Sequence, residues 1–233
     1  MTALSFVVPV YNGAATLEEL AARIAALGIE DSELVLVNDA SPDHSADVCE
    51  RIVEADALTT TFVDLERNCG EHGAVLAGVM HSGGEWIVTL DDDLANPPEE
   101  APRLLSYARS RDYDIVYGRP RRRRYALWRR AGSRFASLTA GALLGKPPGV
   151  SLSTFRCFKR SLLHGATPRA HPYLDRALLE RATRVGSLSV EQHEGTESNY
   201  TLPKLASLWA TMVLPARRSG AQPFHVRRVL RSR

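Results

Sequence analysis

The chain has 233 residues, a formal net charge of +2 at pH 7 and a hydrophobic content of 44%, which fits one α/β domain with a short appendage. It contains no run of about 18 apolar residues, and this excludes an ordinary membrane-spanning helix. Its three widely spaced cysteines form neither a zinc pattern nor a disulfide framework, which favours a reducing cytoplasm.

Strand-like and helix-like segments alternate through the first half of the chain. Near-continuous apolar runs predict buried parallel strands, and apolar residues at helical spacing predict helices. The expected strands are 4–10, 33–37, 60–65, 85–90 and 114–117, and the expected helices are 16–27, 46–55, 73–81 and 98–110. This alternation predicts an α/β domain with a mostly parallel, Rossmann-like sheet flanked by helices.

The second half of the chain is less regular. The pattern predicts a strand at 153–158 and helices at 129–144, 173–183 and 203–213. The last twenty residues are basic and poor in pattern, which is typical of a mobile terminus. We therefore expect a single domain over 1–210 and a basic C-terminal tail over 211–233.

Polar residues follow four of the predicted strands. Open α/β sheets bind their ligands in the crevice beyond the carboxyl ends of the strands, so these residues mark a candidate site. No Gly-x-Gly-x-x-Gly or Walker A pattern follows a strand, which disfavours nicotinamide and P-loop chemistry. The polar clusters are Tyr11-Asn12, Asn38-Asp39, Asn68 and Asp91–Asp93.

The three consecutive aspartates after the fourth strand carry the strongest chemical signal. Adjacent carboxylates raise one another's pKa, and a divalent cation relieves that repulsion. On an extended segment Asp91 and Asp93 point to one side and Asp92 to the other. We therefore expect Asp91 and Asp93 both to bind Mg²⁺ or Mn²⁺ and, through it, a diphosphate, or one of them to bind the metal and the other a sugar. A solvated acidic turn is the alternative interpretation.

Two further groups of polar residues are candidates for ligand contacts. Asp39 is placed to accept hydrogen bonds from a base or ribose, although an Asx turn explains it equally well. The arginines from 119 to 134 are placed to hold a phosphate through bidentate contacts, with a solvated basic loop as the alternative. Aromatic residues are sparse among them, so we expect no nucleic acid partner.

Four segments in a fixed order carry a family resemblance: FVVPVYN from Phe6, LVNDASPD from Leu36, NCGEHGA from Asn68 and VTLDDDLANPPE from Val88. Together they resemble family 2 glycosyltransferases of the GT-A fold. Within that family they are most similar to the polyprenyl-phosphate glycosyltransferases of the dolichyl-phosphate mannose synthase and undecaprenyl-phosphate aminoarabinose transferase types. The resemblance spans roughly residues 4–210.

The resemblance implies a role for each matching position. Residues 1–117 would form the nucleotide-sugar half of the domain and residues 118–210 the acceptor half. The implied catalytic residues are Asp91, Asp93 and Arg119, with Asp93 and Asp91 as metal ligands. The implied nucleotide-sugar contacts are Pro9, Tyr11, Asn12, Asp39, Asn68, Asp91 and Asp92, and the implied acceptor-phosphate contacts are Arg119, Arg130, Arg134 and Arg156.

Five positions depart from the family pattern, among them His72, where Lys or Gln is common, and Asn199, which replaces Lys. Gly13 stands where Glu usually follows Tyr-Asn, and Asn38 replaces the first residue of an Asp-Asp pair. Val150 occupies the position of an aspartate in the mannose synthase type. These departures leave the identity of the sugar and of the acceptor open.

The resemblance implies inverting transfer from a nucleotide-sugar, with UDP favoured over GDP, to a polyprenyl phosphate. The oxygen of such an acceptor is already anionic, since the second pKa of the phosphate is about 6, so no base is required. A small-molecule or peptide acceptor would need a base, with Asp175 or Asp92 as candidates. For Asp175 an exposed position on a helix is the more common reading.

A second alternative is a non-catalytic module that binds a nucleotide-sugar or nucleic acid. Intact Asp91 and Asp93 favour the enzyme. We expect a cytoplasmic protein, with the basic and apolar residues 214–233 able to rest on the inner face of an anionic membrane.

Overall fold

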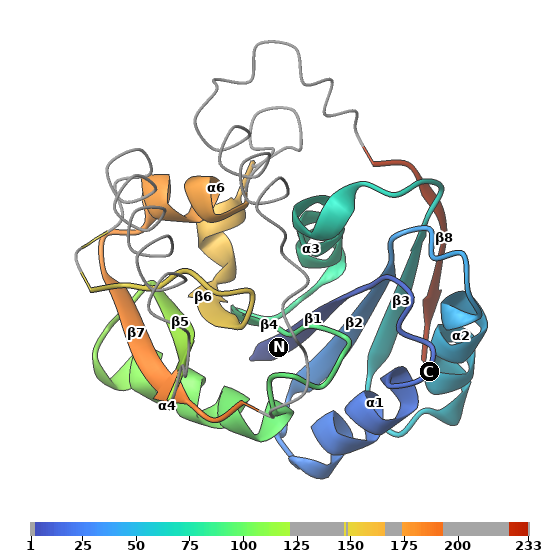
Figure 1. The fold of residues 1–233 in the computed structure, drawn as a ribbon, viewed down its shortest axis with the longest axis horizontal. Coiled ribbons are helices and arrows are strands. Elements are labelled where there is room, and N and C mark those ends of the chain that lie inside the picture. The colour runs from blue at the N-terminus through green and yellow to red at the C-terminus, as the bar shows by residue number, and fades with distance from the viewer. Residues whose placement is uncertain (1–2, 122–146, 148, 166–173, 193–223, 233) are drawn as a thin grey trace, which may run out of the picture.

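The computed structural model describes residues 3–121, 147, 149–165, 174–192 and 224–232. Within these residues one sheet of eight strands lies between two layers of helices (Figure 1). The strands are β1 (Leu4–Val10), β2 (Ser32–Asn38), β3 (Thr60–Leu65), β4 (Trp86–Thr89), β5 (Ile115–Pro120), β6 (Arg156–Lys159), β7 (Val185–Val190) and β8 (Val226–Arg231). The helices are α1 (Leu17–Ala26), α2 (Ser45–Ala55), α3 (Gly70–His81), α4 (Ala101–Ser110) and α6 (Leu174–Arg181), with short 3₁₀ turns at Pro98–Glu100 and Arg160–Leu163.

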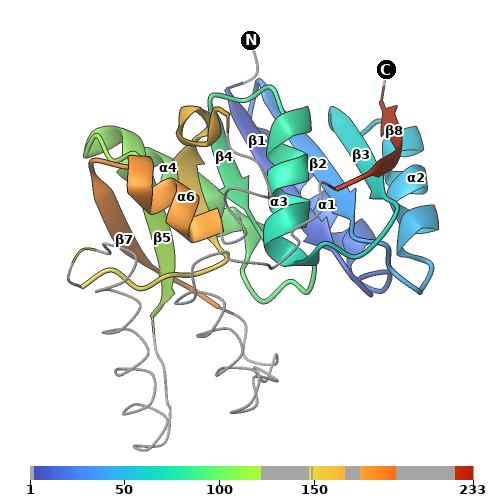
Figure 2. The same ribbon diagram turned by 90° about the horizontal axis from the view of Figure 1, so that it is seen from above.

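The sheet has the order β7-β5-β6-β4-β1-β2-β3-β8, and Figure 2 shows it running from β7 at one edge to β8 at the other. The central strand β1 is parallel to both β2 and β4, and β2 is parallel to β3. The carboxyl ends of these strands therefore lie at one edge of the sheet, as the polar clusters require. The prediction of a mostly parallel α/β sheet flanked by helices is confirmed.

Each strand of the centre buries side chains on both faces, which explains its near-continuous apolar sequence. Val7, Val35 and Val37 pack under α3 in one core cluster. Phe6, Leu34 and their neighbours pack against α1, α2 and α4 in the other. Figure 1 shows α3 and α6 over one face and α1 and α4 over the opposite face.

Two strands run against the others. Strand β6 lies antiparallel between β4 and β5, and β8 lies antiparallel to β3. Because β6 is reversed, its first residues lie beside the last residues of β4. This reversal delivers Thr154 and Arg156 to the edge of the sheet where the aspartates follow β4. A purely doubly wound topology would not bring them there.

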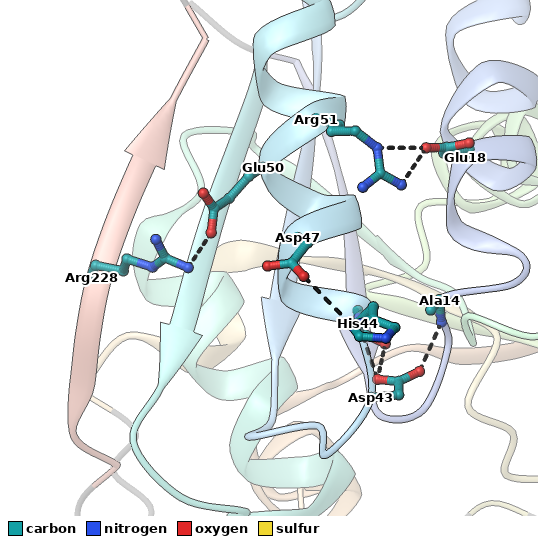
Figure 3. Close-up of polar contacts among 9 residues, drawn as sticks. Ala14, Glu18, Asp43, His44, Asp47, Glu50, Arg51 and Arg228 are labelled. Carbon is teal, nitrogen blue, oxygen red and sulfur yellow. Dashed lines mark hydrogen bonds and ion pairs between the residues drawn. The ribbon is translucent and has the colours of Figure 1, made fainter.

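The C-terminal tail expected from the sequence is wrong for Val226–Arg231, which form β8. Arg227 and Arg228 both pair with the buried carboxylate of Asp64 on β3, at 3.3 and 3.4 Å. Arg228 also pairs with Glu50 on α2, and Arg51 on the same helix pairs with Glu18 on α1 at 2.8 Å (Figure 3). The sequence pattern favoured a mobile segment because the strand that pairs with residues 226–231 is distant in the sequence. The paired residues Asp64 and Arg228, for example, are about 165 residues apart.

Most predicted boundaries agree with the structure, and the exceptions have physical causes. The bounds of β1 and β3 are those expected. Helix α3 starts at Gly70 rather than at residue 73, because the side chain of Asp39, which follows β2, caps it, as described below. Strand β7 was not expected and pairs with β5. The helices predicted at 129–144 and 203–213 lie outside the described residues. None of the helices that the structure describes is both long and apolar enough to cross a membrane.

Candidate active site

Asp91 is held at the carboxyl end of β4 by two neighbouring segments. The Thr154 hydroxyl, just before β6, donates to Asp91 Oδ2 at 2.6 Å, and Asn96 Nδ2 approaches the same oxygen at 3.4 Å. Gln192, after β7, in turn donates to Asn96 Oδ1 at 2.7 Å. Burial, together with the nearby charge of Asp93, raises the pKa of Asp91, whereas the Thr154 hydrogen bond lowers it. The site thus holds a partly buried carboxylate in a fixed orientation.

Asp93 is exposed, and its Oδ1 accepts a hydrogen bond from Ala95 N at 2.9 Å. The described residues contain no group of three His, Cys, Asp or Glu side chains placed to hold a metal ion. Two carboxylates still fit a Mg²⁺ or Mn²⁺ ion that takes further oxygen ligands from a diphosphate. A divalent cation bound there would favour the ionised form of Asp91, against the effect of burial on its pKa.

Asp92 faces away from Asp91, as predicted, although it lies in a turn after β4 rather than in an extended segment. Its Oδ2 accepts a hydrogen bond from Tyr11 N at 2.9 Å, so it joins the end of β4 to the end of β1. Burial raises the pKa of Asp92 to about 6, against the lowering effect of this hydrogen bond. Asp91 therefore faces β6 and Asp92 faces β1.

Asp39 connects the end of β2 to the start of α3. Its two carboxylate oxygens accept hydrogen bonds from Cys69 N at 2.6 Å and Gly70 N at 2.8 Å. These are N–H groups that the first turn of a helix leaves free, so Asp39 caps α3 from a distance in the sequence. Asp39 is only 3% exposed, and burial raises the pKa of its carboxyl group. A contact between Asp39 and a base or ribose stays a prediction.

The other predicted donor contacts line the same edge. Tyr11 is 50% exposed, and Asn12 adopts a positive φ of 59° with its N–H donated to Ser41 Oγ at 3.3 Å. Pro9 is partly buried, whereas Asn68 is exposed and accepts a hydrogen bond from Gly70 N at 3.1 Å. The structure brings these residues to one edge of the sheet, and their contacts with a nucleotide stay predictions.

Asn38 is explained by the buried aspartate beside it. Its Nδ2 donates to Asp64 Oδ1 at 2.8 Å, and its Oδ1 accepts from Ser41 N at 3.1 Å. Both Asn38 and Asp64 are buried. An aspartate at 38, the usual residue of the family pattern, would place two carboxylates in contact. Asparagine therefore suits position 38, because its side-chain amide can donate a hydrogen bond to the Asp64 carboxylate.

Replacing Asn38 by Asp is expected to lower the free energy of unfolding by about 2 kcal/mol at pH 8, because two buried carboxylates then repel each other. The repulsion raises the pKa of the pair in the folded state, so the lost stability should return as the pH falls and the pair shares a proton. Urea unfolding at pH 5 and pH 8 measures both effects. The double variant with Asp64→Asn should regain stability at pH 8, and equal loss in both backgrounds would contradict this explanation.

A buried ion pair joins β6 to α6. Arg156 Nη1 and Tyr117 Oη both donate to Asp175 Oδ1, at 2.7 and 2.8 Å. Arg156 is 1% exposed and Asp175 3% exposed. The reading of Asp175 as an exposed helix residue is therefore wrong. Since the Arg156 guanidinium is enclosed, we assign it to this interior pair rather than to direct contact with an acceptor phosphate.

Glu71 is a further candidate residue, close enough to Asp91 to feel its charge, that the sequence analysis did not single out. It lies in the first turn of α3, and burial raises its pKa to about 7, while the charge of Arg156 lowers it and that of Asp91 raises it. The neighbouring His72 has its pKa lowered to about 4 by burial, which keeps its ring neutral at pH 7. The signal that could have revealed Glu71 is its place in the polar segment that follows β3.

The predicted acceptor arginines are only partly described. Arg119 lies near the end of β5, where its side chain is exposed. Because β5 runs in the same direction as β4, Arg119 and the aspartates lie at the same edge of the sheet. Arg130 and Arg134 lie outside the described residues.

The sequence has clear relatives among known proteins. Residues 5–166 match the family model described as Glycosyl transferase family 2. An undecaprenyl-phosphate 4-deoxy-4-formamido-L-arabinose transferase from Pseudomonas aeruginosa (strain LESB58) is 34% identical over 222 residues, covering 90% of this chain and 64% of that protein. The protein of the same name from Sodalis glossinidius (strain morsitans) is 36% identical over 220 residues, covering 90% and 66%. This chain thus spans just under two thirds of their length.

Solved structures share the fold. Glucosyl-3-phosphoglycerate synthase from Mycobacterium tuberculosis, in complex with UDP, has a TM-score of 0.62 and 18% identity, covering 91% of this chain and 79% of that one. A mannosyltransferase from Pyrobaculum calidifontis, in complex with GDP-Man and Mn²⁺, has a TM-score of 0.60 and 20% identity, covering 84% and 58%. Both are GT-A glycosyltransferases. The chain therefore belongs to glycosyl transferase family 2 and has the GT-A fold.

Proposed function

We propose that the protein transfers a sugar from a nucleotide-sugar, a UDP-sugar in preference to a GDP-sugar, to a polyprenyl phosphate. One observation carries the proposal: a fixed carboxylate, Asp91, and an exposed one, Asp93, share an edge of the sheet with the exposed Arg119. This arrangement supports an acidic metal site for the donor and a cation for an anionic acceptor on neighbouring parts of one fold. The relatives are named as transferases of undecaprenyl phosphate, and this supports a polyprenyl phosphate as the acceptor.

Asp91 and Asp93 would hold a divalent cation, and the bound cation would screen the diphosphate of the donor. Thr154 and Asn96 keep the Asp91 carboxylate oriented before any ligand arrives. Such preorganised groups contribute to catalysis without reorganising during the reaction.

Arg119 would bind and orient the acceptor phosphate through charge-assisted hydrogen bonds. The phosphate oxygen then attacks the anomeric carbon in a single displacement, which inverts the configuration there, and the nucleoside diphosphate leaves. No group of the protein needs to take a proton in this step, because the acceptor is already ionised at neutral pH. The task of the chain is to place two anions together and reduce their repulsion.

A hydroxyl acceptor is the second candidate, and the position of Glu71 favours it: this residue lies in the first turn of α3, which follows the parallel strand β3. A carboxylate whose pKa is about 7 is suited to act as a general base near neutral pH. Asp175 and Asp92, the bases considered from the sequence, are already hydrogen-bonded within the protein. Glu71→Gln should abolish transfer to a hydroxyl acceptor and leave transfer to a phosphate acceptor within about threefold, because only the first reaction needs a base.

The test is a matrix of donors and acceptors with the full chain. UDP-sugars, including UDP-4-deoxy-4-formamido-L-arabinose, and GDP-sugars are offered with Mg²⁺, Mn²⁺ or EDTA. The acceptors are undecaprenyl phosphate in detergent and a panel of water-soluble alcohols. Metal-dependent formation of a lipid-linked sugar supports the proposal. Transfer to alcohols alone would replace it with the second candidate, and nucleotide binding without any transfer would favour a non-catalytic module.

A further inference from the structure

The loop after β1 and the aspartate loop after β4 are joined directly. Besides the bond from Tyr11 N to Asp92 Oδ2, the Thr16 hydroxyl donates to the backbone oxygen of Asp92 at 2.5 Å. Thr16 immediately precedes α1, and its hydroxyl also lies 3.1 Å from the backbone oxygen of Gly13. Both the side chain and the backbone of Asp92 thus hold the segment from Tyr11 to Thr16.

Gly13 leaves the space that the Asp92 carboxylate occupies. A Cβ added at residue 13 would lie 2.8 Å from Asp92 Cγ and 3.1 Å from Asp92 Cβ, and closer still to Oδ2. The φ of Gly13 is not in the left-handed region, so its backbone conformation does not require glycine. We therefore attribute the glycine at position 13 to the space that the Asp92 carboxylate needs.

The loop cannot easily move aside to admit a side chain. Gly13 N donates to the buried Ser45 Oγ at 3.0 Å, and Ala14 N donates to Asp43 Oδ2 at 3.3 Å (Figure 3). Both partners come from the segment that begins α2, so a third part of the chain fixes the loop. A larger residue at position 13 would therefore displace Asp92 rather than the loop.

We propose that Asp92 is a positioning residue that clamps the β1 loop to the aspartate loop, and that Gly13 is the partner that makes the clamp possible. The clamp sets the position of Tyr11, on the nucleotide side, relative to Asp91 and Asp93, on the diphosphate side. It removes Asp92 from the set of direct donor contacts and from the candidate bases. The link to donor binding rests on the proposed function, whereas the clamp itself rests on the contacts above.

A double-mutant cycle with Gly13→Ala, Asp92→Ala and the combined variant tests the clamp. Each single change should raise the Kd for UDP about tenfold, measured by titration calorimetry with Mn²⁺, and raise KM for the donor with kcat changed less than threefold. The double variant should bind no worse than Asp92→Ala, because the added methyl group then meets no carboxylate. An additive loss of about a hundredfold would overturn the proposal.

Asp92→Asn separates a clamp from a metal ligand or base. An amide oxygen still accepts the Tyr11 N–H but neither binds a cation strongly nor takes a proton, so this variant should bind UDP within about threefold of the unaltered protein. A loss as large as that of Asp92→Ala would overturn the proposal.

Thermal unfolding of the same variants needs no ligand, so it still tests the clamp if Gly13→Ala destabilises the protein. Non-additive shifts in Tm are expected, and additive shifts would show that no clamp exists. Coupled shifts in Tm with unchanged Kd for UDP would show a clamp away from any nucleotide site, which overturns the proposal as stated. A different result would refute the proposed acceptor and uphold the clamp: the unaltered protein binds UDP and the variants show the expected coupling, but no sugar is transferred to undecaprenyl phosphate.

Discussion

Replacing Asp175 with alanine is expected to lower the free energy of unfolding by about 3–5 kcal/mol, because it removes the carboxylate that faces a buried guanidinium. Arg156 and Asp175 lie 2.7 Å apart, and both are almost fully enclosed. Charges in such surroundings are expensive unless they are paired. Urea unfolding followed by circular dichroism measures the change.

Helix α6 supplies a matched control for this variant. Glu180 lies on the same helix and pairs with Arg176 at 2.8 Å, but both side chains are about half exposed. Glu180→Ala should change the stability by no more than about 0.5 kcal/mol, since exposed ion pairs contribute little. Tyr117→Phe, which removes one hydrogen bond to Asp175, should cost about 1 kcal/mol. Similar losses from Asp175→Ala and Glu180→Ala would show that the buried pair is not important for stability.

Asp91→Asn should reduce the rate of sugar transfer on the order of 10³-fold, equivalent to about 4 kcal/mol of barrier, because it removes a charge from the metal and diphosphate site. The fold should be unaffected or slightly more stable, since the ionised Asp91 is partly buried beside Asp93. Initial rates with saturating Mn²⁺, together with the Tm of each protein, measure the two effects separately.

Thr154→Val is the graded companion to that experiment. It leaves Asp91 charged but removes the 2.6 Å hydrogen bond that orients it, so we expect a loss of only about tenfold. Near-normal transfer by Asp91→Asn at saturating Mn²⁺ would rule out Asp91 as a ligand of the metal and diphosphate. A loss by Thr154→Val equal to that of Asp91→Asn would mean that orientation, rather than charge, is the main contribution.

Local sequence pattern predicted the elements whose causes are local. The buried strands β1 and β3 were predicted with their observed bounds, because continuous apolar runs show burial on both faces directly. The start of α3 was placed three residues late, because the cap comes from Asp39, about thirty residues earlier. Strand β8 was missed for the same reason, since its stabilising partners lie on β3.

The candidate site also has some features that local sequence predicts and others that only the assembled fold creates. The opposite orientations of Asp91 and Asp92 were predicted from the alternation of an extended segment, whereas in the structure Asp92 and Asp93 lie in a turn after β4. The pairing of Arg156 with Asp175 depends on the reversed strand β6 meeting α6, which no local pattern encodes. Glu71 is similar, because its raised pKa results from burial that only the assembled fold creates. The contacts predicted for Arg130 and Arg134 fall outside the described residues.

The pairing of β8 also protects the sheet from self-association. Every residue of β3 is buried, and five of them pair with β8. Without that cover, the row of N–H and C=O groups along β3 would be an open template for another chain. Strand β8 itself presents arginines at 227, 228 and 231, and charge on an edge strand discourages further pairing. A chain cut at residue 210, where the sequence pattern ends the domain, would expose an aggregation-prone edge and remove both arginines that pair with Asp64.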